Sequence, residues 1–169
     1  IKSKIHEERL LALLILDWQF LKADEAGQKK IYEFYLRHMK RVNNWDLVDL
    51  SAPNIVGQYL LGRNKAILYK WARSDELWVK RIAIMSPAAF IRQRKFADTL
   101  KIAKILLQDD HDLIHKAVGW MLREVGNRDL KVELGFLNKH YKKMPRTMLR
   151  YAIEKFPESL RLKYLKGQI

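Results

Sequence analysis

Cysteine is absent from this chain of 169 residues. Its absence excludes a disulfide framework, a zinc site built on thiolates, an iron–sulfur cluster and a cysteine nucleophile. A chain without cysteine also suits the cytoplasm, which is where we expect this protein. Glycine and proline are scarce, with 7 and 4 residues. Such a composition is not that of a collagen-like or low-complexity chain.

Long apolar runs are missing too, because nowhere does the chain reach the ~18 uncharged apolar residues that a membrane span needs. The one sustained apolar stretch near the start, residues 10–16, is followed at once by Asp17 and lacks a small-residue cleavage site. We therefore expect neither a membrane span nor a signal peptide. Also absent are a Gly-rich phosphate loop, a Gly-x-Ser-x-Gly elbow and a His-Glu-x-x-His helix, which excludes the enzyme classes that depend on them.

Positive charge is the most pronounced feature of the composition. The 33 Lys and Arg residues outnumber 19 Asp and Glu residues, which gives a net charge of +14. The surplus is confined to residues 61–104 (+8) and residues 140–169 (+6). A nucleic-acid backbone is the natural partner of such segments, because each neutralised phosphate releases a counterion. The alternative is that the charge serves solubility alone.

Apolar residues recur at helical spacing along nearly the whole chain. We expect helices over residues 5–21, 28–41, 45–50, 65–73, 96–107, 109–125, 128–142 and 145–155, another opened by Ser51-Ala52-Pro53, a long one from Ser74 through Arg92 that Pro87 kinks or divides, and a basic one after Pro157. No β-alternation extends over five residues. The sequence therefore predicts an all-α fold.

Many short helices joined by tight turns indicate stacked helical hairpins rather than a four-helix bundle. Trp45, Trp78 and Trp120 stand in similar surroundings at intervals of 33 and 42 residues, close to the ~40–47 residues of HEAT-type repeats. We predict a single domain over residues 1–169, folded as a HEAT-like, right-handed solenoid of helical hairpins (an α–α superhelix) with a concave basic surface. We expect it to be a monomer.

Two histidines, His111 and His115, are spaced i,i+4 and could share a metal ion on one helix face. No third ligand is positioned by the sequence, and we predict neither a metal nor another cofactor. The alternative is that His111 caps the start of its helix and His115 lies on a basic surface.

Residues 43–50 combine Trp45 with two carboxylates and three apolar side chains. Trp45 and Asp49 are i,i+4 and share a helix face. A half-buried carboxylate on an electropositive protein is suited to stabilise a developing cation. The alternative makes Asp46 an ordinary first-turn helix residue and Asp49 a salt-bridge partner.

Two further segments could contribute to a site. Arg81 lies beside an apolar run, which favours a held guanidinium over a freely solvated one. Gly119 would let another helix approach closely. Trp120, which follows it, belongs either to the core or to a cleft, and from the sequence alone the core is the better interpretation.

Four ordered segments together resemble the DNA alkylation repair glycosylases of the AlkD type, which are built from HEAT-like repeats. They are NWDLVD at residues 44–49, WVKRIAI at 78–84, KAVGWMLRE at 116–124 and PRTMLRYAIEK at 145–155. The resemblance extends from about Ile5 to about Leu165. Family members carry additional helices before the equivalent of Ile5, and we expect this chain to lack them.

The resemblance implies both a reaction and its residues. The family hydrolyses the N-glycosidic bond of cationic N7- or N3-alkylated purines in duplex DNA, without drawing the base into a pocket. Its cleft holds a Trp four residues before a catalytic Asp, which corresponds to Trp45 and Asp49. Its cleft Arg and second cleft Trp correspond to Arg81 and Trp120. We therefore expect a DNA glycosylase of base excision repair whose partner is double-stranded DNA with alkylated bases.

We expect the DNA backbone to be bound by Lys80 and Lys116, which sit beside the cleft, and by Arg146 and Arg150, which share a helix face. Two other functions stay open. One is a HEAT-like DNA-binding module without catalysis, and the other is a protein-interaction solenoid whose charge is incidental.

The remaining tryptophans, Trp18, Trp71 and Trp78, have no counterpart in the family's cleft. We expect them to be mainly structural.

Overall fold

The computed structural model describes residues 1–169 and is all-α, as the sequence predicts. In chain order the helices are α1 (His6–Lys22), α2 (Glu25–His38), α3 (Trp45–Ser51), α4 (Gln58–Leu60), α5 (Ala66–Trp71), α6 (Leu77–Met85), α7 (Ala88–Arg92), α8 (Ala97–Ile105), α9 (Asp112–Gly126), α10 (Leu130–His140), α11 (Arg146–Ala152) and α12 (Glu158–Lys166). A π-helix, Ala52–Gly57, joins α3 to α4, and 3-10 turns follow α2, α10 and α11. None of the helices is both long and apolar enough to cross a membrane.

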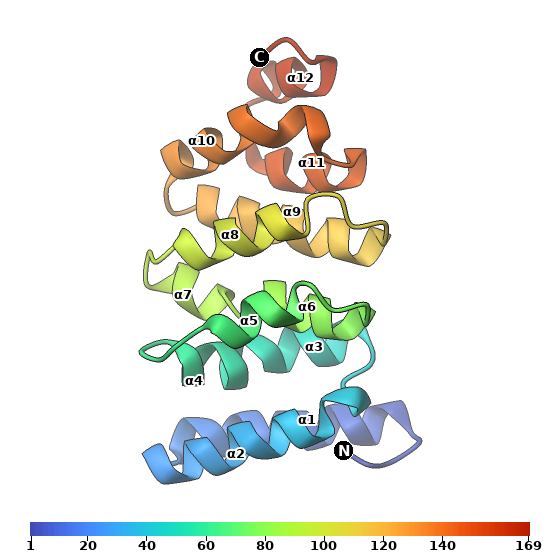
Figure 1. The fold of residues 1–169 in the computed structure, drawn as a ribbon, viewed down its shortest axis with the longest axis vertical. Coiled ribbons are helices and arrows are strands. Elements are labelled where there is room, and N and C mark those ends of the chain that lie inside the picture. Colours follow the sequence, from blue (N-terminus) through green and yellow to red (C-terminus); the bar gives the residue numbers. More distant parts are fainter.

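The helices form successive pairs stacked along the long axis, with the two termini towards opposite ends (Figure 1). Helices α2, α5 and α8 lie in the nearer layer of this view, whereas α1, α3, α6 and α9 lie behind them. In the more distant layer α3 packs on α1 and α6, and α9 packs on α6 and α11. The stack of hairpins predicted from the sequence is thus the observed arrangement.

One continuous apolar core runs through the stack and contains 41 buried residues. Tyr35 in the second helix, Phe90 near the middle and Tyr164 in the last helix are all essentially inaccessible. A single helix pair cannot enclose its own apolar face, so each pair is buried by its neighbours. Each fully buried aliphatic or aromatic side chain contributes about 1.5–3 kcal/mol to that association.

Several helix boundaries follow from local chemistry that the sequence makes visible. The Asn44 side chain caps α3 by accepting a hydrogen bond from the Trp45 amide at 2.8 Å. His111 caps α9, since its Nδ1 accepts from the Leu113 amide at 3.2 Å. Pro87 separates α6 from α7, because a proline cannot donate the backbone hydrogen bond that would continue the first helix.

Residues 51–53 open a helical element with Pro53 in its first turn, as expected, but this element is a π-helix. Helix α3 continues without a break into the π-helix, which contains Pro53. Proline has no amide hydrogen, so it cannot donate to the Asp49 carbonyl as an α-helix would require, and wider π-type pairing accommodates this gap. Gly57 then brings the π-helix against the end of α6, because a Cβ at that position would lie 2.2 Å from the Ser86 carbonyl oxygen.

The repeat inferred from tryptophan spacing was wrong. Four corresponding helices, α3, α6, α9 and α11, begin at intervals of 32, 35 and 34 residues. Trp45 is the first residue of α3 and Trp78 the second of α6, but Trp120 is the ninth of α9. The three tryptophans therefore occupy different positions in their helices, and their spacing is not the structural period.

Trp71 is buried and Trp78 packs partly buried against the core, as expected for structural residues. Trp18 differs, because 62% of its surface is exposed. It lies on α1, which α2 and α3 cover on one side only, and α1 also exposes Leu11, Leu14, Ile15 and Leu21. Helical spacing on α1 thus did not identify which of its apolar residues are buried.

Candidate active site

The most specific polar contact in the molecule joins Asp49 of α3 to Arg81 of α6. Arg81 Nε donates to Asp49 Oδ1 at 2.9 Å, and Nη2 donates to Oδ2 at 2.7 Å. This bidentate pairing matches the planar fork of the guanidinium to both carboxylate oxygens. The sequence placed these residues 32 positions apart, and the stacking of α3 on α6 brings them together.

A third contact extends this link to α9. Arg81 Nη1 donates to the backbone carbonyl oxygen of Leu113 at 2.5 Å. Arg81 is only 4% exposed, so its side chain has little freedom to adopt another rotamer. Three consecutive helices of the stack therefore fix the orientation of the Asp49 carboxylate.

Burial raises the pKa of Asp49 above its ordinary value of 3.8, and the two hydrogen bonds from Arg81 oppose the rise. Nearby Asp46 adds a smaller upward contribution to the same pKa. Asp46 itself faces a different neighbour, because its Oδ2 lies 2.7 Å from Nε2 of His6 on α1. The two carboxylates of α3 thus occupy different environments.

A pocket of about 280 Å³ opens beside Asp49. Its walls include Pro53 from the π-helix, Met85 from α6, and Trp120 and Met121 from α9. Trp120 is partly exposed rather than fully buried, so it lines a cleft, whereas sequence reasoning without the resemblance favoured the core. The pocket places an aromatic ring and a carboxylate on one concavity, which is an arrangement that can stabilise a cation.

Trp45 completes the set of residues expected from the resemblance, but it does not line that pocket. It is 53% exposed and lies one helical turn before Asp49 on α3. The structure therefore brings Asp49, Arg81 and Trp120 together directly. Trp45 is not in contact with this pocket and shares with Asp49 only the same face of α3.

Four of the predicted site residues share one position in their helices. Asp49, Arg81, Lys116 and Arg150 are the fifth residues of α3, α6, α9 and α11. Because these helices stack in sequence, the four side chains follow one another along the same layer. The residues are far apart in the chain, and it is the register of the stack that aligns them.

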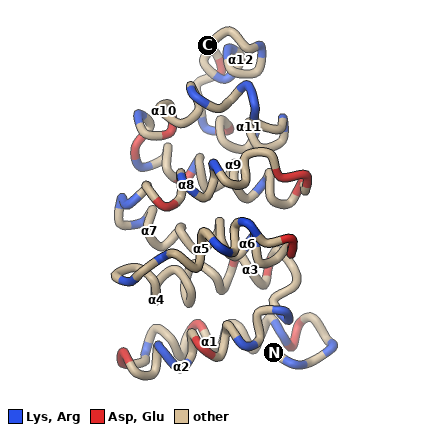
Figure 2. Tube along the Cα trace, in the orientation of Figure 1, with Lys and Arg blue, Asp and Glu red and all other residues tan.

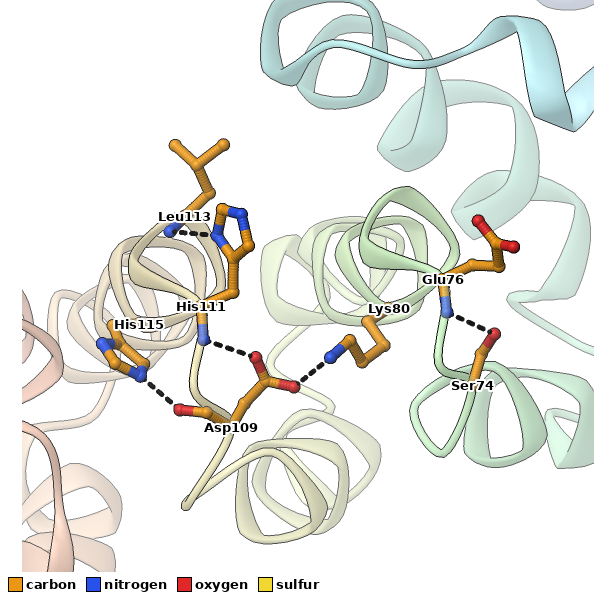
Figure 3. Close-up of polar contacts among 7 residues, drawn as sticks. All are labelled: Ser74, Glu76, Lys80, Asp109, His111, Leu113 and His115. Carbon is orange, nitrogen blue, oxygen red and sulfur yellow. Dashed lines mark hydrogen bonds and ion pairs between the residues drawn. The ribbon is translucent and has the colours of Figure 1, made fainter.

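Lys80, which we expected to bind phosphate, is held within the protein. Its ammonium forms an ion pair with Asp109 in the loop before α9, with side-chain exposures of 17% and 8% (Figure 3). The same carboxylate accepts a hydrogen bond from the His111 amide at 3.0 Å. Lys80 therefore connects α6 to the start of α9, next to the Leu113 carbonyl that receives Arg81.

The other three predicted phosphate ligands are nearer to solvent. Lys116 forms an i,i+4 pair with Asp112 at 2.7 Å and is partly exposed. Arg146 is exposed and donates to the Leu165 carbonyl at 3.0 Å. Arg150 is exposed and has neither an ion pair nor a side-chain hydrogen bond to another protein group.

The two histidines considered as metal ligands are engaged in hydrogen bonds. His111 caps α9, and the His115 ring contacts the Asp109 carbonyl oxygen (Figure 3). No group of three His, Cys, Asp or Glu side chains is placed to hold a metal ion.

Several residues near the site were not singled out from the sequence. Met85 lines the pocket as the ninth residue of α6, the position that Trp120 occupies in α9. Glu124 and Arg128 also line it and form an i,i+4 ion pair at 2.6 Å. Recognising the period of 32 to 35 residues would have pointed to Met85, whereas the charged pair resembles any surface pair in a helix.

Gly119 fulfils the role that the sequence suggested. A Cβ at this position would lie 2.4 Å from the Met148 carbonyl oxygen and 2.5 Å from Cβ of Tyr151. The glycine therefore lets α9 and α11 pack in close contact, which fixes the helix that carries Trp120.

A family model described as DNA alkylation repair enzyme matches residues 1–156. The chain therefore belongs to the DNA alkylation repair enzyme family. No curated protein gives a significant match.

Proposed function

We propose that the chain is a DNA glycosylase that hydrolyses the N-glycosidic bond of cationic N7- or N3-alkylated purines in duplex DNA, as a step of base excision repair. The observation that carries this proposal is the Asp49 carboxylate, held by Arg81 at the edge of a pocket that Trp120 also lines. Family membership supports a role in the repair of alkylated DNA.

The chemistry requires little acid catalysis, because an alkylated purine already carries positive charge. As the bond between C1′ and the base nitrogen breaks, its electron pair neutralises the base, and positive charge develops on the sugar. Water then adds to C1′ and loses a proton, which leaves a free base and an abasic site. The protein's task is to stabilise the cationic sugar and to admit water.

Asp49 is the group that stabilises the cationic sugar. An ionised carboxylate in a partly desolvated pocket interacts more strongly with a nearby cation than one in bulk water does. Arg81 acts as a positioning residue, since it holds both carboxylate oxygens and is itself anchored to Leu113. The face of Trp120, which lines the same pocket, would add cation–π attraction, and we propose the same role for Trp45, which lies one helical turn before Asp49.

The DNA backbone would be bound by the exposed cations of the stack. We propose Lys116, Arg146 and Arg150, because they are the solvent-exposed members of the predicted set. Lys80 is less suited to this role, because its ammonium is enclosed and already paired with Asp109.

The decisive experiment measures release of 7-methylguanine from methylated duplex DNA by the purified chain and by Asp49→Asn. The variant keeps the size of the side chain but removes its charge, so excision should fall ~10²-fold or more. Duplex affinity should be unchanged or higher, because a negative charge near phosphates is lost.

Asp46→Asn provides the matched control on the same helix, since its carboxylate contacts His6 instead of the pocket. Excision by Asp46→Asn should remain close to that of the unmodified chain. Equal losses in both variants, or normal excision by a folded Asp49→Asn protein, would reject the assignment.

A DNA-binding module without catalysis is the second candidate, and the geometry of the Asp49–Arg81 pair is compatible with it. A buried bidentate pair can hold two helices together without taking part in any reaction. On this alternative the unmodified chain binds duplex DNA but releases no base, and Asp49→Asn lowers only the free energy of unfolding.

A further inference from the structure

A second charged surface lies on the outer layer of the stack, formed by α5, α8 and α10. Helix α5 packs on α6, α8 on α6 and α9, and α10 on α9, so all three turn one face away from the layer that carries Asp49. None of the residues that line the Asp49 pocket comes from these three helices. Figure 2 shows basic residues along α8 and α10 in this layer, which are all lysines, and one acidic residue on each helix. This outer surface is therefore distinct from the candidate active site.

Two depressions mark the outer surface. One, of about 500 Å³, lies between α5 and α8, and the other, of about 310 Å³, lies between α8 and α10. Lys101 and Lys104 line both depressions. The two lysines thus form a basic ridge with a hollow on each side.

The cations around these hollows have no carboxylate partners. Neither Lys101 nor Lys104 takes part in any ion pair of the protein, and the same is true of Arg73 and Lys139 at the outer ends. The pKa of His140 is lowered by burial and by repulsion from Lys104, Lys139 and Lys143. The cations outnumber the one carboxylate at this surface, Asp98, which accepts a hydrogen bond from Tyr69. The surface therefore carries a net positive charge that an anionic partner would neutralise.

Apolar side chains also line both depressions. Ile105 lies in the hollow beside α5, and Leu100, Val132 and Phe136 lie in the hollow beside α10. Duplex DNA presents phosphates to a surface of this kind but has no apolar side chains to fill its hollows. A peptide that alternates carboxylates with aliphatic or aromatic residues supplies both groups.

We propose that this outer surface is a docking site for an acidic segment of a partner protein. Its carboxylates would face the ridge of Lys101 and Lys104, and its apolar side chains would enter the two depressions. Such a site would let the protein bind a partner while the opposite layer is free for another ligand.

The test uses a fluorescent synthetic peptide of alternating Glu, Asp, Leu and Phe, and a second peptide in which Ser replaces every Leu and Phe. Fluorescence anisotropy with the full chain at physiological salt should show at least ~10-fold tighter binding of the apolar acidic peptide. Equal affinities for the two peptides, or binding of neither, would overturn the proposal.

Two double variants locate the site on the protein. Lys101→Glu/Lys104→Glu should weaken binding of the apolar acidic peptide at least ~10-fold, whereas Lys163→Glu/Lys166→Glu should change it little. The second pair is matched, because both pairs are exposed, are spaced i,i+3 on one helix and change the net charge equally. Circular dichroism establishes that both variants are folded.

Duplex DNA serves as the competing probe. If Lys101→Glu/Lys104→Glu weakens duplex binding as much as peptide binding, the surface is a nucleic-acid site and the proposal is wrong. Excision of 7-methylguanine by this variant should be unchanged. The peptide-binding measurements do not depend on whether the proposed glycosylase activity exists.

Discussion

Lys80 and Asp109 form an ion pair that is largely enclosed by the protein, although a lysine next to a cleft arginine would be expected to face DNA. The pair joins α6 to the loop that leads into α9. The neighbouring residue, Arg81, joins α6 to α3 and to the first turn of α9. Two consecutive cations of α6 therefore hold together the three helices that position Asp49.

We expect Lys80→Met to lower the free energy of unfolding by about 3 kcal/mol, because it leaves the buried Asp109 carboxylate without its countercharge. Urea denaturation measures this change. The double variant Lys80→Met/Asp109→Asn should recover most of the loss, since it removes the unpaired charge and keeps an acceptor for the His111 amide. Normal stability of Lys80→Met together with weaker duplex binding would instead identify Lys80 as a phosphate ligand.

The pH dependence of excision should report the environment of Asp49. Only the ionised carboxylate can stabilise a cation, and burial raises its pKa above 3.8. Single-turnover excision should therefore decline on the acid side at a pH higher than that value. Arg81→Lys should move the decline to still higher pH, because lysine cannot donate two parallel hydrogen bonds to the carboxylate. A decline at or below pH 3.8 would contradict this account of the Asp49 environment.

Gly119→Ala should destabilise the protein by about 1–3 kcal/mol, because the added methyl group would overlap the backbone of α11. The measurement is the midpoint of thermal or urea unfolding. Gly135→Ala is the control, since no atom lies within 4 Å of a Cβ at that position on α10. The control should be neutral or up to ~1 kcal/mol more stable, because alanine favours a helix more than glycine does. Similar losses in the two variants would mean that close packing is not the reason for Gly119.

Glu133 gives the protein a second pH dependence, unrelated to the candidate active site. Its side chain is essentially inaccessible, Oε1 has no hydrogen-bond partner, and burial raises its pKa from 4.5 to about 8. The folded state thus binds a proton that the unfolded state releases between these pH values. The free energy of unfolding should therefore fall by ~1.4 kcal/mol for each pH unit across this window as the pH rises.

Glu133→Gln removes this ionisation, and urea unfolding of the variant should lose that slope between pH 4.5 and about 8. Glu158→Gln on α12 alters an exposed carboxylate and should leave the slope as it is. A slope that persists in Glu133→Gln would assign the pH dependence to another group.

Arg150 should contribute to duplex binding through charge alone. Replacing it with Gln is expected to lower the slope of log affinity against log salt by ~0.9, the value for one lost phosphate contact. The preference among DNA sequences should not change, because phosphate contacts carry no sequence information. Lys30→Gln, on the exposed face of α2, should leave the slope unaltered, and equal effects of the two substitutions would argue against a specific contact by Arg150.

Local features of the structure could be predicted from the sequence because they depend on residues a few positions apart. Helical spacing predicted the all-α fold, and Pro87 predicted the division of a long helix. Gly119 signalled a close helix contact because only glycine lacks a Cβ, although its partner α11 could not be named. Family resemblance then pointed to Asp49, Arg81 and Trp120, which lie together in the structure.

What only the tertiary structure decided was the partner of each charged side chain and the register of the stack. The sequence did not distinguish Lys80, which is enclosed with Asp109, from Arg150, which is free in solvent. It placed the repeat on tryptophans that occupy unequal positions, and it did not show that the helix opened near Pro53 is a π-helix continuous with α3. These features depend on which surfaces meet when helices pack, because the residues that pair are far apart in the chain: 29 positions separate Lys80 from Asp109, and 32 separate Asp49 from Arg81.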